Sequence, residues 1–302
     1  MKAPKVGLEQ WRVLQAVIDC GGYAQAAKRL HRSQSSVSYS VAKLQEQLGV
    51  TLLRIEGRKA VLTPTGETLL RRSRQLVDDA AELETLAHCL EQGWEGEIKL
   101  VVDAAFPNCY LMPALQRFMP VSRGTRVQLN EVILSGADEA LLEGRADLVI
   151  GARVPSGFLG DRLLEVEFVA VAHRDHALHR LERALNPADL RREMQVVIRD
   201  SGLTLKRDIG WLGTEYRWTV SSLDTAVDAV ASGLGFGWLP RHKIGSLLNE
   251  GLLKPLPLHE GQSRYASLYL IFGHPTSVGP ATQQLAELLA RVCQENRDGN
   301  FC

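Results

Sequence analysis

Apolar residues in the first fifty positions recur at the spacing of α-helices. One apolar stripe runs from position 8 to 18, a short helix is expected over 23–30, and a third helix is expected over 34–48. Ser33 offers a side-chain oxygen that can cap the third helix, and Gly49 can end it in a left-handed conformation. The pattern predicts three short helices that bury their apolar faces in one small core.

The third helix has two unlike faces. Val37, Val41 and Leu44 share its apolar face, whereas the opposite face carries short or planar hydrogen-bonding groups rather than a Glu/Lys ladder. Two short strands are expected next, over 52–55 and 60–62, with basic residues in the turn between them. Three helices followed by a basic hairpin predict a winged helix-turn-helix, whose third helix enters the DNA major groove and whose wing contacts phosphate or the minor groove.

The candidate DNA contacts lie on that polar face and in the wing. They are Ser33, Gln34, Ser35, Ser38, Tyr39, Lys43, Arg58 and Lys59. Side chains of these types can hydrogen-bond to phosphates or to base edges. The alternative is an ordinary helix N-terminus with a solvated polar face and, for Tyr39, a packing role.

A long helix is expected over 63–92, because Thr63 and Pro64 suit a helix start and neither glycine nor proline follows Gly66 within it. Leucines recur in this helix at every seventh position, namely Leu69, Leu76, Leu83 and Leu90. A seven-residue repeat is typical of a helix that pairs with a second helix. We therefore expect homodimerisation along these leucines, the alternative being a helix packed on its own domain.

Strands and helices alternate after about residue 93. One β/α series is expected up to residue 151 and a second between 195 and 240, and a helix over 281–294 closes the chain. Such alternation favours mostly parallel sheets with helices on both faces. Two long extended runs, over 163–172 and 265–272, bracket the second series. They predict a chain that crosses twice between two α/β lobes, with a cleft between the lobes.

The charge of the chain is unevenly distributed. Its 35 basic and 35 acidic residues give a formal net charge of zero, yet residues 1–74 carry 13 Lys/Arg and 5 Asp/Glu, a net of +8 against −8 for the rest. A basic N-terminal quarter favours a polyanion-binding module. No apolar run reaches the roughly 20 residues that span a bilayer, and the chain does not start like a secretory signal. We expect a cytoplasmic protein with no membrane partner.

Sequence motifs in both halves resemble one family. The segment AAKRLHRSQSSVS at 26–38, with LQEQLG at 44–49 and TPTG at 63–66, resembles the DNA-binding domain of LysR-type transcriptional regulators. LEGRAD at 142–147 and AVASGLG at 229–235 resemble the effector-binding domain of the same family, a two-lobed fold similar to periplasmic binding proteins. The resemblance implies an antiparallel pair of linker helices in a dimer, and a small-molecule effector.

In folds of this kind ligands bind beyond the carboxyl ends of strands, where helix N-termini offer free N–H groups. The candidate effector-binding residues at such positions are Asp103, Ala104, Ala105, Phe106, Ser135, Gly136, Ala152, Arg153, Asp200, Ser201, Thr204, Phe236 and Trp238. The alternatives are a helix cap for Asp103 and Asp200, and core packing for Phe236 and Trp238. If Asp103 faces the cleft, an effector with an amine or several hydroxyl groups is favoured.

Enzyme and metal signatures are weak. His173, His176 and His179 lie in a polar stretch without the spacing of a metalloprotease helix, so we expect no metal, no catalytic residue and no cofactor. The five scattered cysteines show no CxxC pair, which predicts reduced thiols. Redox sensing at Cys109 is an alternative to its expected role as a small buried core residue.

The expected fold is an α+β multidomain chain with an N-terminal winged helix-turn-helix, a long linker helix and a C-terminal two-lobed α/β domain. Its predicted boundaries are 1–62, 63–92 and 93–302, with lobe I over about 97–167 and 271–302 and lobe II over about 168–270. The expected partners are double-stranded DNA with an interrupted palindromic operator, a small-molecule effector, and further copies in a homodimer and homotetramer. The alternatives are a redox-responsive regulator and a metal-dependent enzyme with a DNA-binding module.

Overall fold

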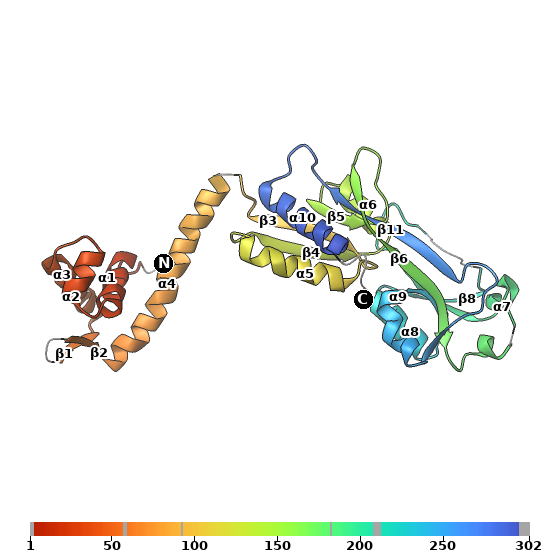
Figure 1. Cartoon of the computed structure of the whole chain (residues 1–302), viewed down its shortest axis with the longest axis horizontal. Helices are drawn as coiled ribbons and strands as arrows, with labels where there is room; N and C mark the ends of the chain where they lie inside the picture. Colours follow the sequence, from red (N-terminus) through yellow and green to blue (C-terminus); the bar gives the residue numbers. More distant parts are fainter. Residues whose placement is uncertain (1–2, 57–58, 92, 182, 208–212, 296–302) are drawn as a thin grey trace. The chain divides into compact units, whose positions relative to one another are not determined.

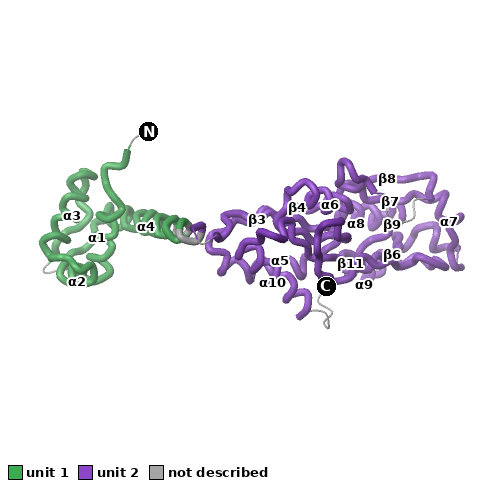
Figure 2. The backbone as a smooth tube through the Cα atoms, turned by 90° about the horizontal axis from the view of Figure 1, so that it is seen from above, with its two compact units in different colours: residues 1–88 green, residues 89–302 purple. Residues whose placement is uncertain are grey.

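The computed structural model describes residues 3–56, 59–91, 93–181, 183–207 and 213–295. The chain divides into two compact units, residues 1–88 and residues 89–302, which Figures 1 and 2 trace through their elements. The predicted three-part division at residues 62 and 92 assigns roles to segments, which compactness does not test, so it stays a prediction.

The first unit begins with three helices and a hairpin. These are α1 (Leu8–Asp19), α2 (Tyr23–Arg29), α3 (Gln34–Leu48), β1 (Leu53–Glu56) and β2 (Lys59–Leu62). Ser33 caps α3 by accepting a hydrogen bond from the Ser36 N–H at 3.2 Å, and Gly49 ends it with a φ of 70°, as predicted. The three helices share one buried core that includes Leu14, Val37 and Leu44.

The long helix α4 (Pro64–Glu91) is confirmed, and Thr63 caps it by accepting a hydrogen bond from the Gly66 N–H at 3.0 Å. Its first turns pack on the core of the helix-turn-helix through Leu70 and, in part, Leu69. The Gln15 amide donates to the buried Ser73 hydroxyl at 3.4 Å. The start of α4 is therefore held by its own unit.

The second unit is built on one continuous mixed sheet. The described strands are β3 (Glu97–Asp103), β4 (Arg126–Val132), β5 (Leu148–Gly151), β6 (Gly160–His173), β7 (Met194–Ile198), β8 (Tyr216–Val220), β9 (Phe236–Pro240), β10 (Leu253–Pro255) and β11 (Ser263–Phe272). They follow the order β4-β3-β5-β11-β6-β9-β7-β8, with β10 paired to β6. The prediction of mostly parallel sheets was incomplete, because the antiparallel pair β6–β11 joins a parallel group at each end.

Helices cover both faces of the sheet in each lobe. They are α5 (Asn108–Phe118), α6 (Ser135–Leu142), α7 (Pro187–Arg191), α8 (Leu223–Ala231), α9 (Arg241–Asn249) and α10 (Pro280–Glu295), with the 3-10 turns η1 (Met119–Val121) and η2 (Ala177–Leu181). In lobe I, which contains β3, β4 and β5, α5 and α10 lie side by side on one face and α6 on the other (Figure 1). In lobe II, which contains β7, β8 and β9, α8 and α9 share one core, and the segment from η2 to α7 packs on the opposite face.

Two helices, α7 and α9, and one strand, β10, were not predicted. The helix α9 follows directly after Pro240, where the apolar run of β9 ends, and it buries Ile244 against lobe II. The short α7 starts at Pro187 behind the capping residue Asn186 in a stretch of polar composition. Of the helices in the described part of the chain, none is long and apolar enough to cross a membrane.

Candidate functional site

The polar face of α3 is exposed along its whole length. The described candidates on it are all at the surface: Ser33, Gln34, Ser35, Ser38, Tyr39 and Lys43. Tyr39 is 65% exposed, and the Lys43 ammonium lies 5.8 Å from the centroid of its ring. Tyr39 therefore does not pack in the core, and α3 presents hydrogen-bonding groups and one cation to the solvent.

The wing is described only in its two strands. Arg58 and the side chain of Lys59 lie outside the described residues, so their predicted DNA contacts stay predictions. Gln45, which the sequence pattern did not single out, anchors the wing on α3 because its side-chain oxygen accepts from the N–H groups of Leu52 and Leu53 at 2.7 and 3.0 Å. A glutamine on the half-buried side of a helix was the signal for this role.

Three of the four predicted seam leucines are exposed on α4. Leu76 is 49%, Leu83 67% and Leu90 49% exposed, whereas Leu69 is partly buried against the core of the first unit. Ser73 also faces that core rather than the solvent. The available apolar seam thus begins at Leu76, one heptad later than predicted.

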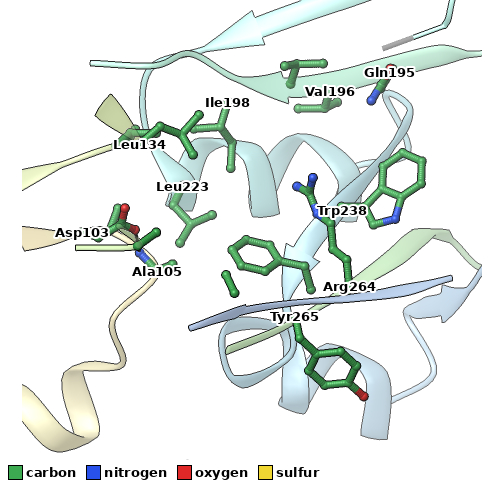
Figure 3. A pocket seen from close by; sticks show the side chains of 16 residues that line it. Asp103, Ala105, Leu134, Gln195, Val196, Ile198, Leu223, Trp238, Arg264 and Tyr265 are labelled. Carbon is green, nitrogen blue, oxygen red and sulfur yellow. Dashed lines mark hydrogen bonds between the residues drawn. The ribbon is translucent and has the colours of Figure 1, made fainter. Parts of the chain in front are cut away.

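A cavity of about 170 Å³ lies between the two lobes of the second unit (Figure 3). Its lining comes from lobe I (Asp103, Ala104, Ala105, Ile133, Leu134, Ala152), from lobe II (Gln195, Val196, Val197, Ile198, Leu223, Trp238) and from the connecting strands (Phe168, Arg264, Tyr265, Ala266). Five predicted effector residues are among them: Asp103, Ala104, Ala105, Ala152 and Trp238. Most of the lining is apolar, so the charged side chains in it decide which ligand chemistry fits.

Asp103 ends β3 with its carboxylate buried at the cavity. Burial raises the pKa of Asp103 to about 6, opposed by hydrogen bonds from the backbone N–H groups of Ala105, at 2.9 Å, and Leu134. The nearby charges of Glu131 and Asp138 raise this pKa further. Asp103 accepts from the turn after β3 and faces the cavity, and it does not cap a helix as the alternative proposed, because the residue before α5 is Pro107.

Arg264 enters the cavity from β11, and the sequence pattern did not single it out. Its guanidinium carbon lies 5.2 Å from the centroid of the Phe168 ring, and burial lowers its pKa. Its buried Nη1 has no hydrogen-bond partner among the described residues. Figure 3 shows the guanidinium beside Trp238, on the side of the cavity away from Asp103. In the sequence, the only available sign of this role was one arginine in an otherwise neutral extended run.

Five predicted effector residues lie outside the cavity lining and join the lobes instead. Ser135, Gly136, Asp200, Ser201 and Thr204 belong to what we call the interlobe clasp, residues 133–139 of lobe I and 200–207 of lobe II. The Asp200 carboxylate accepts from the Ser135 N–H at 3.0 Å and from the Ser135 hydroxyl at 2.7 Å. The Ser201 hydroxyl accepts from the Ile133 N–H at 2.9 Å. The N-terminus of α6 is thus occupied by a carboxylate of the protein itself.

Glu139 makes the second part of the clasp. Its buried carboxylate accepts from the N–H groups of Leu203, Thr204 and Leu205 at 2.7–2.8 Å and from the Thr204 hydroxyl at 2.9 Å. These hydrogen bonds lower the pKa of Glu139 to about 2. Arg207 forms an ion pair with Asp138, whose side chain is buried. Glycine is required at 136, because a β-carbon there would collide with the Ser201 side chain.

Leu134 connects the clasp to the cavity. It has a φ of 53° and a ψ of −111°, a combination that strains a leucine. Its backbone donates to Asp103 in the cavity, and the next residue, Ser135, binds Asp200 in the clasp. A ligand that shifts Leu134 would therefore act on both.

The remaining predicted effector residues are elsewhere. Phe106 is buried in the core of lobe I and Phe236 in the core of lobe II, as the core-packing alternative proposed for Phe236. Arg153 is exposed and does not line the cavity.

The histidines and cysteines bear on the alternative functions. Among the described residues, no group of three His, Cys, Asp or Glu side chains is placed to hold a metal ion. Cys109 is half-buried at the start of α5 and is disulfide-bonded, which differs from the prediction of a reduced, buried core cysteine. Cys293 is buried in the core of lobe I.

Comparison with known proteins agrees with both halves of the fold. Residues 8–67 match the model of the bacterial regulatory helix-turn-helix protein, lysR family, and residues 91–294 match the LysR substrate binding domain. The chain belongs to the LysR family of transcriptional regulators. It is 34% identical over 255 residues to the HTH-type transcriptional regulator YeeY of Escherichia coli (strain K12), covering 82% of this chain and 81% of YeeY.

Two further LysR-type proteins resemble the chain. The HTH-type transcriptional regulator YhaJ of Escherichia coli O157:H7 is 30% identical over 256 residues, covering 82% of this chain and 84% of YhaJ. The structure of full-length LysG from Corynebacterium glutamicum, which has the effector Arg bound, superimposes with a TM-score of 0.53 at 20% identity, covering 96% of this chain and 99% of LysG. LysR regulators bind DNA and small-molecule effectors and form oligomers. The cavity described above lies in the effector-binding domain.

Proposed function

We propose that this LysR-type regulator binds an interrupted palindromic operator in the cytoplasm as a homodimer, or as a homotetramer of two such dimers. A small molecule that binds in the cavity between the lobes controls the DNA binding of this regulator, and the small molecule itself is not chemically altered. The observation that carries the proposal is the exposed polar face of α3 in a chain that also contains an interlobe cavity. Two modules on one operator combine weak half-site affinities through their high effective concentration.

The seam on α4 supports pairing of two chains. Leu76, Leu83 and Leu90 would be covered by the same leucines of a second copy, which removes apolar surface from water. Because a two-fold axis then relates two α3 helices, the expected operator has two half-sites of opposite direction.

The proposed control uses the two connections between the lobes. The strands β6 and β11 form the hinge, and the clasp holds the lobes together beside the cavity. An effector changes DNA binding only as far as it favours one arrangement of the lobes over another. Contact with Asp103 and Leu134 is the most direct route from the cavity to the clasp.

Gel shift of the full-length protein on DNA upstream of its own gene, across a salt series, tests the DNA-binding face. Gln34→Ala should weaken specific binding roughly 10- to 100-fold and relax sequence selectivity, because a lost bidentate base contact costs about 1–3 kcal/mol. Lys43→Gln should weaken binding to all sequences alike and reduce the salt slope by about 1. Arg126→Gln, an exposed charge change in the second unit, is the matched control.

Unchanged selectivity in Gln34→Ala together with an unchanged salt slope in Lys43→Gln would contradict a DNA-reading role for this face of α3. Selective binding lost equally in Arg126→Gln would point to a general charge effect.

A redox response is the second candidate function, favoured by the disulfide at Cys109. Disulfides in cytoplasmic proteins are usually catalytic or redox-sensing rather than structural. The measurement is operator affinity of the full-length protein under dithiothreitol and under oxidised glutathione. A redox regulator changes its affinity between the two and loses the change in Cys109→Ser, whereas equal affinity under both conditions excludes this candidate.

A further inference from the structure

The cavity contains a cation whose charge the described protein leaves without an anionic partner. Arg264 has no carboxylate bound to it among the described residues, and its Nη1 is buried without an acceptor. The Phe168 ring, 5.2 Å from the guanidinium carbon, is the only compensation that the described contacts show. Buried guanidinium groups are normally paired, because removing a charge from water without an acceptor is costly.

The surroundings of Arg264 offer room for a ligand. Trp238 already donates its indole N–H to the Gly261 carbonyl at 2.9 Å, so it presents its ring to a ligand. Trp238 and Arg264 also line a second hollow in lobe II. Arginine is suited to bind a carboxylate through two parallel hydrogen bonds.

The remaining walls of the cavity are apolar and disfavour charged groups on the body of a ligand. Leu134, Ile198 and Leu223 form apolar walls between Asp103 and Arg264 (Figure 3). The accessible volume of about 170 Å³ is close to that of cavities of about 150 Å³ that take up benzene. A ligand body about the size of one ring therefore fits between the two charged side chains.

Asp103 limits the ligand to one anionic group. Its carboxyl faces the cavity at the lobe I side and accepts from Ala105 and Leu134, with Glu131 and Asp138 nearby. A second carboxylate on the ligand would meet this acidic group, whereas a hydroxyl or an apolar end would not be repelled.

We propose that the effector of this cavity is a small monocarboxylate with an apolar body about the size of one ring, bound through its carboxylate to Arg264. This assignment rests on the proposed function, since it names the ligand class of the same interlobe site. It shifts the expectation drawn from Asp103 alone, an amine or polyol, to an anion held by Arg264.

The test measures binding to the full-length protein by isothermal titration at a pH of about 7.5, where carboxylic acids are ionised. The probes are benzoate, phenylacetate and 3-methylbutanoate, each beside its primary amide, with terephthalate as the dicarboxylate. The variants are Arg264→Gln, which removes the charge, and Arg264→Lys, which keeps the charge but lacks the paired N–H donors of the guanidinium. Arg162→Gln, on the neighbouring strand β6 and paired with Glu165, is the matched control.

At least one monocarboxylate should bind about tenfold or more tightly than its amide, and terephthalate should bind more weakly than benzoate. Arg264→Gln should abolish the preference for the anion, Arg264→Lys should retain part of it, and Arg162→Gln should match the unchanged protein. The proposal is overturned if amides bind as well as carboxylates, if Arg264→Gln keeps the preference, or if no carboxylate of the panel binds.

Operator binding separates this outcome from a failure of the proposed function. Each variant is first checked by circular dichroism and by gel shift on operator DNA. A protein that binds its operator but shows no carboxylate preference remains a regulator with another ligand class. If Arg264→Gln does not fold, the comparison of Arg264→Lys with Arg162→Gln still decides the assignment.

Discussion

Two aspartates with similar positions at strand ends have different surroundings in this protein. Asp103 and Asp200 both follow a strand, yet Asp103 is buried at a cavity, where its pKa rises to about 6. Asp200 instead accepts hydrogen bonds from Ser135 across the clasp and from the backbone of Gly202 and Arg207 in its own segment. For Asp103, burial outweighs the hydrogen bonds that its carboxylate accepts, and burial disfavours the ionised form.

Asp103 should make the stability of the protein depend on pH between about 4 and 6. Its pKa is raised on folding, so its contribution to stability is fully present below about 4 and is lost as pH rises through about 6. The free energy of unfolding of the second unit should fall by up to about 3 kcal/mol over this interval. Urea titrations across pH should show this fall, and Asp103→Asn should remove it.

Asp161→Asn, an exposed acid at the start of β6, is the control for the loss of one negative charge. A stability profile in Asp103→Asn that still falls between pH 4 and 6 like that of the unchanged protein would show that another group is responsible.

At the scale of elements, the long helix and the clasp are held by different kinds of interaction. The start of α4 is packed on the helix-turn-helix core, while its later turns expose Leu76, Leu83 and Leu90. The clasp is held by hydrogen bonds between α6 and residues 200–207. We therefore expect apolar-to-polar changes to affect α4 pairing and carboxylate changes to affect the clasp.

Leu83→Glu should weaken dimerisation strongly. A leucine buried in each of two chains contributes about 1.5–3 kcal/mol per chain, so the dimer dissociation constant should rise at least about 100-fold. Sedimentation equilibrium of the full-length protein measures this constant. Thr85→Glu, which adds the same charge two residues away on a different face of α4, should leave it nearly unchanged. Equal effects of the two substitutions would contradict pairing along the leucine seam.

Glu139→Gln should loosen the clasp without unfolding the lobes. The hydrogen bonds from Leu203, Thr204 and Leu205 lower the pKa of Glu139 to about 2, so its contribution to stability is present above about 4.3 and is lost as pH falls toward 2. Replacing the carboxylate weakens these bonds at neutral pH as well. Trypsin should then cleave after Lys206 or Arg207 faster than in the unchanged protein, as mass spectrometry of the fragments would show.

Glu143→Gln at the end of α6, where Glu143 pairs with Arg145, is the control for this cleavage. If both variants are cleaved at the same rate as the unchanged protein, Glu139 does not hold the loop.

At the scale of the whole molecule, the chain separates its charge by task. The net charge of +8 on residues 1–74 favours contact with phosphates, and the net of −8 on the remainder is repelled by them. A net charge of zero therefore says nothing against a DNA partner. The same separation keeps an acidic effector-binding domain from competing for the duplex.

The sequence by itself determined the helix-turn-helix, the long helix and the order of strands and helices in the second unit. These elements depend on short-range features that a linear pattern contains: apolar spacing, the caps Ser33 and Thr63, and the helix stop at Gly49. The elements that the pattern missed, α7, α9 and β10, are short or follow directly on another element.

Only the tertiary structure decided which residues line the cavity. Asp103 and Asp200 were equivalent candidates in the sequence, but Asp200 meets Ser135, 65 residues away, and becomes part of the clasp. Arg264 was not a candidate, and β11 brings it beside Phe168 and Trp238. The physical reason is that the partners of a buried charge come from other segments, so packing rather than local sequence decides whether the charge is satisfied or left for a ligand.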